Sequence, residues 1–210
     1  MYFKKDDINK LDRNRRIRLI NSISGPKSAN LIGTIDDSSH TNLAIISSVI
    51  HLGSDPPLLG FILRPNENVR RDTYDNILLN QEFTINHVNK DIVEQSHWTS
   101  AKFSKEVSEF DVCNLTVEFL DSFSAPFVKE SNVKIGLKLV DQIDIKLNQT
   151  KLIIGEINHI MLEDNYLDSD GSLNLSKSNS ISVCGLNSYY RLNKYKDFPY
   201  SRVEDLPDFK

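Results

Sequence analysis

The sequence predicts a mainly β fold, a β-barrel with short helices. Short apolar segments recur along the chain with turn-forming residues between them. In a parallel sheet, strands alternate with helices, because each parallel connection needs a crossover that is usually a helix. The apolar segments of this chain show no such regular alternation. The chain has 210 residues, and barrels of this length are commonly single domains. We therefore expect one barrel domain over residues 21–188, with a helical segment before it at 1–20 and a tail after it at 189–210.

Strands are expected where apolar residues cluster between turn signals. The expected strands are residues 29–35, 43–49, 58–64, 83–88, 115–120, 133–140 and 151–162. Residues 36–39 and 53–57 are rich in the Asp, Ser, Gly and Pro residues that form hairpin turns. Asp170-Gly171 marks a later turn.

Helices are expected in three places. Residues 6–20 have a partial apolar face, and two aspartates at their start suit a helix N-terminus because they meet the positive end of the helix dipole. Asp72 and Thr73 can cap a second, short helix. Residues 91–94 resemble a capping box for a third.

The two ends of the chain differ in character from the middle. Arginines between positions 13 and 18 give the first helix a basic face. The simplest interpretation is a solvated surface, and the alternative is a contact with an anion or a partner. The tail at 189–210 is rich in aromatic residues, which a disordered segment rarely is. We expect it to lie across its own subunit or a partner subunit, with plain disorder as the alternative.

Composition excludes several classes of protein. The formal net charge of −4 argues against nucleic-acid binding by bulk charge. No apolar run reaches the roughly 18 residues of a membrane helix, and the start MYFKKDD lacks the apolar core of a signal peptide. Cys113 and Cys184 are far apart, so neither a disulfide framework nor a zinc site is expected. We expect a soluble, cytoplasmic protein without a membrane partner.

No familiar catalytic or metal-binding motif occurs. The sequence contains no GxSxG, P-loop, GxGxxG or HExxH pattern. The histidines have no metal-ligand spacing, and we interpret His87 and His97 as structural rather than ligating.

Three polar residues could bind a phosphate group. Arg64 ends an expected strand, and its guanidinium can form paired hydrogen bonds with a phosphate. Thr73 and Asn76 lie at the start of a short helix, where free N–H groups and the helix dipole favour anions. Each residue also has a simpler interpretation, since Arg64 could be a surface charge and Thr73 only a helix cap.

The order of motifs along the chain resembles the flavin reductase-like, FMN-binding split-barrel family. Ser47-Ser48-Val49 follows a strand and precedes the Asp-Pro-Pro turn, as the segment that lines the flavin ring does in that family. Thr73-Tyr74-Asp75-Asn76-Ile77 resembles the family's phosphate-binding segment. Thr99-Ser100-Ala101-Lys102-Phe103 resembles a further segment that contacts the flavin. The resemblance covers residues 21–190.

This resemblance implies an FMN-binding split β-barrel that works as a homodimer, with the flavin near the subunit interface. It also implies hydride transfer from NADH or NADPH to the flavin and then to an acceptor, with the flavin carrying the chemistry. No catalytic acid or base and no metal is then required from the protein. The implied cofactor-binding residues are Asn42, Ser47, Ser48, Val49, Arg64, Thr73, Asn76, Asn86, Ser100 and Lys102.

Two other functions stay open at this point. A non-catalytic flavin-binding or electron-carrier protein would use the same site, because a fold does not determine a function. A nucleic-acid-associated protein that acts through its basic first helix is the weaker alternative, because the chain as a whole is acidic.

Overall fold

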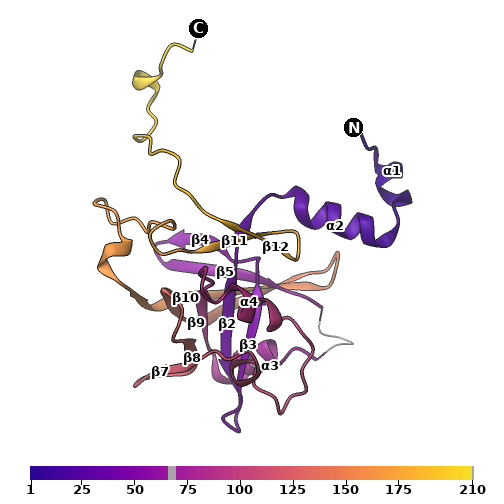
Figure 1. Cartoon of the computed structure of the whole chain (residues 1–210), viewed down its shortest axis with the longest axis vertical. Helices are drawn as coiled ribbons and strands as arrows, with labels where there is room; N and C mark the ends of the chain where they lie inside the picture. The colour runs from indigo at the N-terminus through magenta and orange to yellow at the C-terminus, as the bar shows by residue number, and fades with distance from the viewer. Residues whose placement is uncertain (66–69, 210) are drawn as a thin grey trace.

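The computed structural model describes residues 1–65 and 70–209, and it confirms the mainly β fold (Figure 1). Seven strands form the central sheet in the spatial order β3-β2-β6-β9-β10-β5-β4, and all neighbours pair antiparallel. Their bounds are β2 Asn30–Ile35, β3 Thr41–Ile46, β4 Ile50–Ser54, β5 Pro57–Leu63, β6 Glu82–His87, β9 Val133–Ile145 and β10 Thr150–Leu162. Two smaller sheets consist of β1 Lys27–Ser28 with β11 Ile181–Cys184 and β12 Ser188–Arg191, and of β7 Val117–Leu120 with β8 Phe123–Val128.

The helices are short. They are α1 Lys5–Lys10, α2 Arg13–Ile23, α3 Asp72–Asn80, α4 Val93–Trp98 and α5 Glu109–Val112, with 3-10 turns at Asp164–Tyr166 and Val203–Asp205. α3 packs against β2 and β3, and α4 and α5 pack against β3. Among the described residues, no helix is both long enough and apolar enough to cross a membrane.

Apolar cores lie on both faces of the central sheet, because side chains alternate between the two faces along each strand. On β2, Ile32 belongs to a core that includes Phe83, whereas its neighbour Leu31 belongs to a core that includes Phe110. All four side chains are fully buried. α3 contributes to the first of these cores, so the start of this helix is held firmly against the barrel.

Most expected strands are confirmed, with different limits. The strand expected at 43–49 ends at Ile46, and a separate strand, β4, begins at Ile50. β8, β11 and β12 are not among the expected strands. β8 contains Pro126, and β11 and β12 have only 4 residues each, so their alternation is too short to stand out from the sequence.

Two expectations about helices are wrong. The helix expected at 6–20 is broken at Asp12, whose carboxylate accepts hydrogen bonds of 3.0 Å from two backbone N–H groups in the first turn of α2. Asp12 thereby starts a new helix. The capping box expected at 91–94 does not form, because Ile92 is the N-cap of α4 and no side chain caps that helix.

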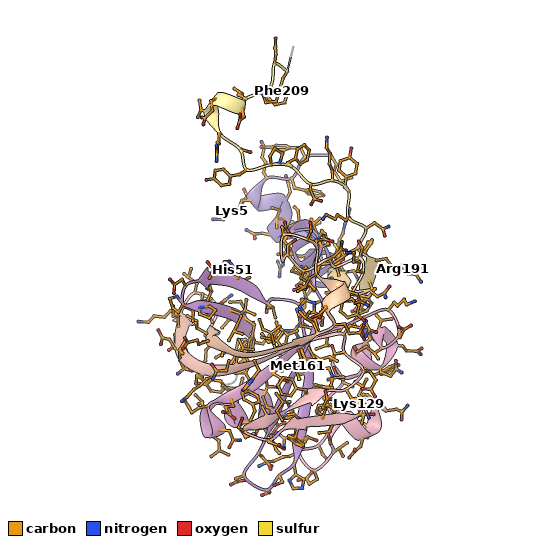
Figure 2. All side chains as sticks on the ribbon, turned by 90° about the vertical axis from the view of Figure 1, so that its left-hand side faces the viewer. Lys5, His51, Lys129, Met161, Arg191 and Phe209 are labelled. Carbon is orange, nitrogen blue, oxygen red and sulfur yellow. The ribbon has the colours of Figure 1, made fainter. Side chains whose placement is uncertain are left out.

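Both ends of the chain extend away from the barrel (Figures 1 and 2). We call residues 1–23 the N-terminal arm and residues 192–209 the C-terminal tail. α1 and α2 bury no residue. The tail expected from residue 189 packs on its own barrel only at its start, where the hydroxyl of Tyr189 lies 2.9 Å from Nδ1 of His97. Tyr195 is 96% exposed and Phe209 84% exposed, so these later aromatic side chains do not pack on the barrel. Packing on a partner subunit stays a prediction, and residue 210 lies outside the described residues.

His87 at the end of β6 should make stability depend on pH. Its Nδ1 lies 3.2 Å from the hydroxyl of Ser180, and burial lowers the pKa of His87 from 6.5 to about 4. The unfolded chain therefore binds this proton more tightly than the folded chain does. Stability should fall as the pH decreases from 6.5 toward 4. In the His87→Gln variant, the urea unfolding midpoint should decrease less between pH 6.5 and 4 than in the unmodified protein. Identical pH profiles for the two proteins would show that His87 does not cause the decrease in stability.

Candidate functional site

β3 is an edge strand of the central sheet, yet side chains cover part of its free edge. The N–H of Leu43 donates to Oε2 of Glu109, and the N–H of Ile45 donates to Oγ1 of Thr99, each at 3.0 Å. Edge strands are commonly covered in this way because their unpaired N–H and C=O groups would otherwise pair with other chains. Both partners belong to the segment that carries α4 and α5, so this segment runs beside the β3 edge.

Ser48 links the end of β3 to β5. Its hydroxyl accepts a hydrogen bond from the N–H of Ile62 at 3.0 Å and donates to the carbonyl oxygen of Ile62 at 3.2 Å. Val49 packs against the core that contains Phe83. The predicted Ser47-Ser48-Val49 segment therefore lies where β3 approaches β5.

A small polar network fixes the start of α3 to β2 and β3. The amide nitrogen of Asn42 donates to Oγ1 of Thr73 at 3.0 Å and to Oγ1 of Thr34 at 3.2 Å. The amide nitrogen of Asn76 also donates to Oγ1 of Thr34, at 3.2 Å. The structure thus brings together three of the predicted residues, Asn42, Thr73 and Asn76. Because these side chains are bound within one network, they fix the position of α3 on the sheet.

The start of α3 lies beside the end of β5, because Nε of Arg71 donates to the carbonyl oxygen of Pro65 at 3.4 Å. Arg71 is the N-cap of the helix, which no side chain caps, and Arg64 directly follows β5. Burial, and next the nearby charge of Arg64, lower the pKa of the Arg71 guanidinium. Asp72 is bound to Arg70 at 2.8 Å, and within residues 1–65 and 70–209 no carboxylate pairs with Arg64 or Arg71. Positive charge at a helix N-terminus favours an anion, and the first turn of α3 also carries the acidic residues Asp72 and Asp75.

A polar hollow beside α3 differs from the region of the two arginines because several acidic side chains line it. Its lining includes Asp36, Asp72 and Glu109, together with Lys105. Burial raises the pKa of the Glu109 carboxyl, as expected where a charge loses water. Carboxylates would repel a phosphate, so we assign the anion site to the two arginines instead. The part of the chain that the structure describes contains no cluster of side chains suited to a metal ion.

Ser100 and Lys102 lie on the surface next to the β3 edge, because Thr99 holds their segment against Ile45. The hydroxyl of Ser100 donates to the carbonyl oxygen of His97 at 2.7 Å. The Lys102 side chain is exposed and is therefore available to a ligand.

Comparison with known proteins decides the family. The model of the flavin reductase like domain matches residues 25–178. The chain belongs to the flavin reductase-like family. This membership confirms the resemblance that the motifs indicate, and it supports a flavin-related redox function.

Solved structures agree with the family. A split-barrel protein from Shewanella frigidimarina, described as a candidate flavin reductase, has 47% sequence identity and a TM-score of 0.91, and the match covers 96% of this chain and 100% of that chain. A match of that extent includes parts of the N-terminal arm and of the C-terminal tail. Flavoredoxin from Desulfovibrio vulgaris shares the fold, with 24% identity and a TM-score of 0.73 over 84% of this chain and 92% of that chain. An uncharacterized protein from Aquifex aeolicus is 28% identical over 184 residues, which are 87% of this chain and 92% of the relative.

Asn86 does not belong to the site of this flavin reductase-like barrel. Its fully buried amide donates to the carbonyl oxygen of Leu31 at 3.2 Å and to Oγ1 of Thr84 at 2.8 Å, and it accepts from the N–H of Val128 at 3.0 Å. The bond from Val128 fastens β8 to β6, and the bond to Leu31 joins β6 to β2. The register places Asn86 on the face of the sheet opposite to Asn42. We therefore propose a structural role for Asn86 in place of the predicted contact with the cofactor.

Sequence reasoning overlooked Arg71, Thr99 and Glu109. Arg71 carried a usable signal, because it immediately precedes the predicted cap of α3. Thr99 lies in a segment that the family resemblance already included, but its bond to β3 is a tertiary contact. Nothing in the local sequence distinguishes Glu109 from the other acidic residues of the chain.

Proposed function

We propose that the chain binds FMN and acts as an NAD(P)H-dependent flavin reductase. The observation that carries this proposal is the hydrogen bond of 3.4 Å from Nε of Arg71, at the uncapped start of α3, to the carbonyl oxygen of Pro65, which directly follows Arg64 at the end of β5. The phosphate of FMN needs positive charge and hydrogen-bond donors in one place, and guanidinium groups with helix N–H groups provide both. Because Asn42 and Thr73 fix α3 to the sheet, these donors are held in position before a ligand arrives.

The remainder of the cofactor would lie along the free edge of β3. Backbone N–H groups of the Ser47-Ser48-Val49 segment would hold the polar edge of the ring. Ser100 and Lys102 would approach from the segment that Thr99 attaches to β3. FMN, when bound, would supply acceptance of hydride from NADH or NADPH and delivery of electrons to an acceptor. The role of the protein is then to bind and orient the cofactor, and no catalytic acid or base is required from it.

Titration with FMN tests this proposal. We expect quenching of flavin fluorescence with a Kd below about 10 μM, which corresponds to about 7 kcal/mol. An absence of quenching at tens of micromolar FMN would refute flavin binding. Steady-state oxidation of NADH and NADPH with added FMN separates the reductase from the alternative, a non-catalytic flavin-binding or electron-carrier protein, which would bind FMN without accelerating the oxidation.

Lys102→Ala should weaken the binding of FMN more than that of riboflavin. Lys102 is exposed beside the β3 edge, where its ammonium could reach the phosphate end of the cofactor, and riboflavin has no phosphate. The expected loss is roughly 1.5–3 kcal/mol, the contribution of a charged hydrogen bond. Equal weakening of both ligands, measured by parallel fluorescence titrations, would show that Lys102 does not contact the phosphate.

We also propose a cytoplasmic homodimer whose interface helps to enclose the flavin. β4 supports it, because this edge strand exposes Ile50 (43%) and Leu52 (40%) directly after Ser47-Ser48-Val49. Exposed apolar edge strands are usually covered by another surface. Light scattering should give twice the chain mass of 24.0 kDa, and a monomer that still binds FMN tightly would refute the dimer.

A further inference from the structure

The N-terminal arm carries a groove that the proposed flavin site does not use. It lies between the start of the chain and α2, and its lining includes the apolar residues Met1, Phe3 and Leu19 together with Arg15 and Arg18. The arm extends away from the barrel, and its two helices bury no residue (Figure 1). Helices this short gain most of their stability from packing on another surface, so the arm lacks the contact that would hold it.

The C-terminal tail has the complementary character. Residues 203–209 contain three carboxylates and no basic residue, whereas residues 13–18 contain four arginines and no acidic residue. Leu206 is 72% exposed, so the end of the tail also offers an apolar side chain without a contact. The tail therefore matches the groove in both charge and apolar pattern.

The N-terminal arm and the C-terminal tail leave the barrel in different directions (Figure 1). This arrangement favours contact between the tail of one copy and the arm of another copy. The N-terminal arm enters the fold through β1 and the tail leaves through β12, and β11 lies between these strands. Lys194 pairs with Asp168 at 2.7 Å, which holds the first part of the tail to its own barrel. From there the tail diverges from α1 and α2, and its end lies apart from them in Figure 1. In a dimer with twofold symmetry, the same pair of surfaces would meet twice.

We propose, on the basis of the homodimer proposed above, that residues 203–209 of a second copy dock in the groove of the N-terminal arm. Glu204 and Asp205 of one copy pair with Arg15 and Arg18 of the other, and Leu206 packs against Leu19. Each copy thereby gives its tail to the partner and receives the partner's tail. The arginines of α2 then serve assembly, rather than a nucleic acid or a solvated surface.

Disulfide trapping between two differently tagged proteins tests the exchange. One protein carries Leu19→Cys and the other carries Leu206→Cys, both with Cys184→Ala, while the buried Cys113 is kept. After the two are mixed and oxidised, we expect a disulfide-linked species that contains both tags, at twice the chain mass of 24.0 kDa. Ile20→Cys is the matched control, because Ile20 is exposed next to Leu19 but does not line the groove. It should give far less of this species.

The outcomes separate the docking from the dimer itself. A dimer by light scattering that gives no more cross-link at Leu19 than at Ile20 would overturn the docking and leave the homodimer intact. A monomer would overturn both. In a further variant, one chain carries both Leu19→Cys and Leu206→Cys. A disulfide that forms only within this single chain, and not between the two tagged proteins, would overturn the exchange between copies.

Charge reversal gives an independent test of the same docking. Glu204→Lys with Asp205→Lys should raise the dissociation constant of the dimer by about tenfold. Adding Arg15→Glu and Arg18→Glu to the same chain should restore it, because the pairs are reformed with opposite signs. An unchanged dissociation constant in the first variant, or no rescue in the second, would overturn the proposed pairing. Far-UV circular dichroism and the urea unfolding midpoint serve as the controls for folding in all of these proteins.

Discussion

Replacing Arg64 and Arg71 together by alanine is expected to weaken FMN binding about a thousandfold while riboflavin binding changes little. Each guanidinium would make a charge-assisted hydrogen bond worth roughly 1.5–3 kcal/mol, so the pair would contribute about 4 kcal/mol. Among residues 1–65 and 70–209, no carboxylate pairs with either arginine. Parallel fluorescence titrations with FMN and riboflavin measure the difference directly.

Arg70→Ala is the matched control for this experiment. Arg70 is adjacent in sequence, but it is bound to Asp72 at 2.8 Å, so its loss should change FMN affinity less than about tenfold. Arg71→Lys should recover only part of the affinity, because an ammonium keeps the charge but not the planar fork. If the double variant weakened FMN and riboflavin equally, the arginines would not be phosphate ligands.

The sequence predicted the barrel well because strand alternation and turn chemistry are local signals. The hairpin turn at 36–39 forms as expected, since the Asp36 carboxylate accepts from the N–H groups of Ser38 at 2.9 Å and His40 at 2.8 Å. Strands of 4 residues such as β11 and β12 exist only because they pair with each other and with β1. Such strands leave no local signal, and sequence reasoning missed them.

The candidate site could be predicted only in part. Motif order was enough to select Asn42, Thr73 and Asn76, which the structure joins in one network. Arg71 was missed because its position beside Pro65 at the end of β5 is a contact made only when α3 folds back to that strand. A motif gives the chemistry of a side chain, but the register of the sheet decides which face that side chain occupies.

Asn86→Ala should destabilise the fold by about 3 kcal/mol and leave the FMN affinity of the folded protein unchanged. The substitution removes the acceptor for the buried N–H of Val128, and an unsatisfied buried group of this kind costs about 1–3 kcal/mol. It also removes the two hydrogen bonds that the amide donates, to Leu31 and Thr84. β8 packs closely on this face of β2, because a Cβ on Gly33 would collide with the carbonyl oxygen of Pro126.

Urea unfolding and FMN titration, applied to the same preparation, separate the two roles that Asn86 could have. A structural residue shifts the unfolding midpoint and leaves the dissociation constant alone. Lys102→Ala should show the reverse pattern, because Lys102 is exposed and its loss leaves no buried group unpaired. A stable Asn86→Ala protein that binds FMN weakly would return Asn86 to the flavin site. It would also require that β6 present this side chain to the face that carries Asn42, against the register that the sheet now has.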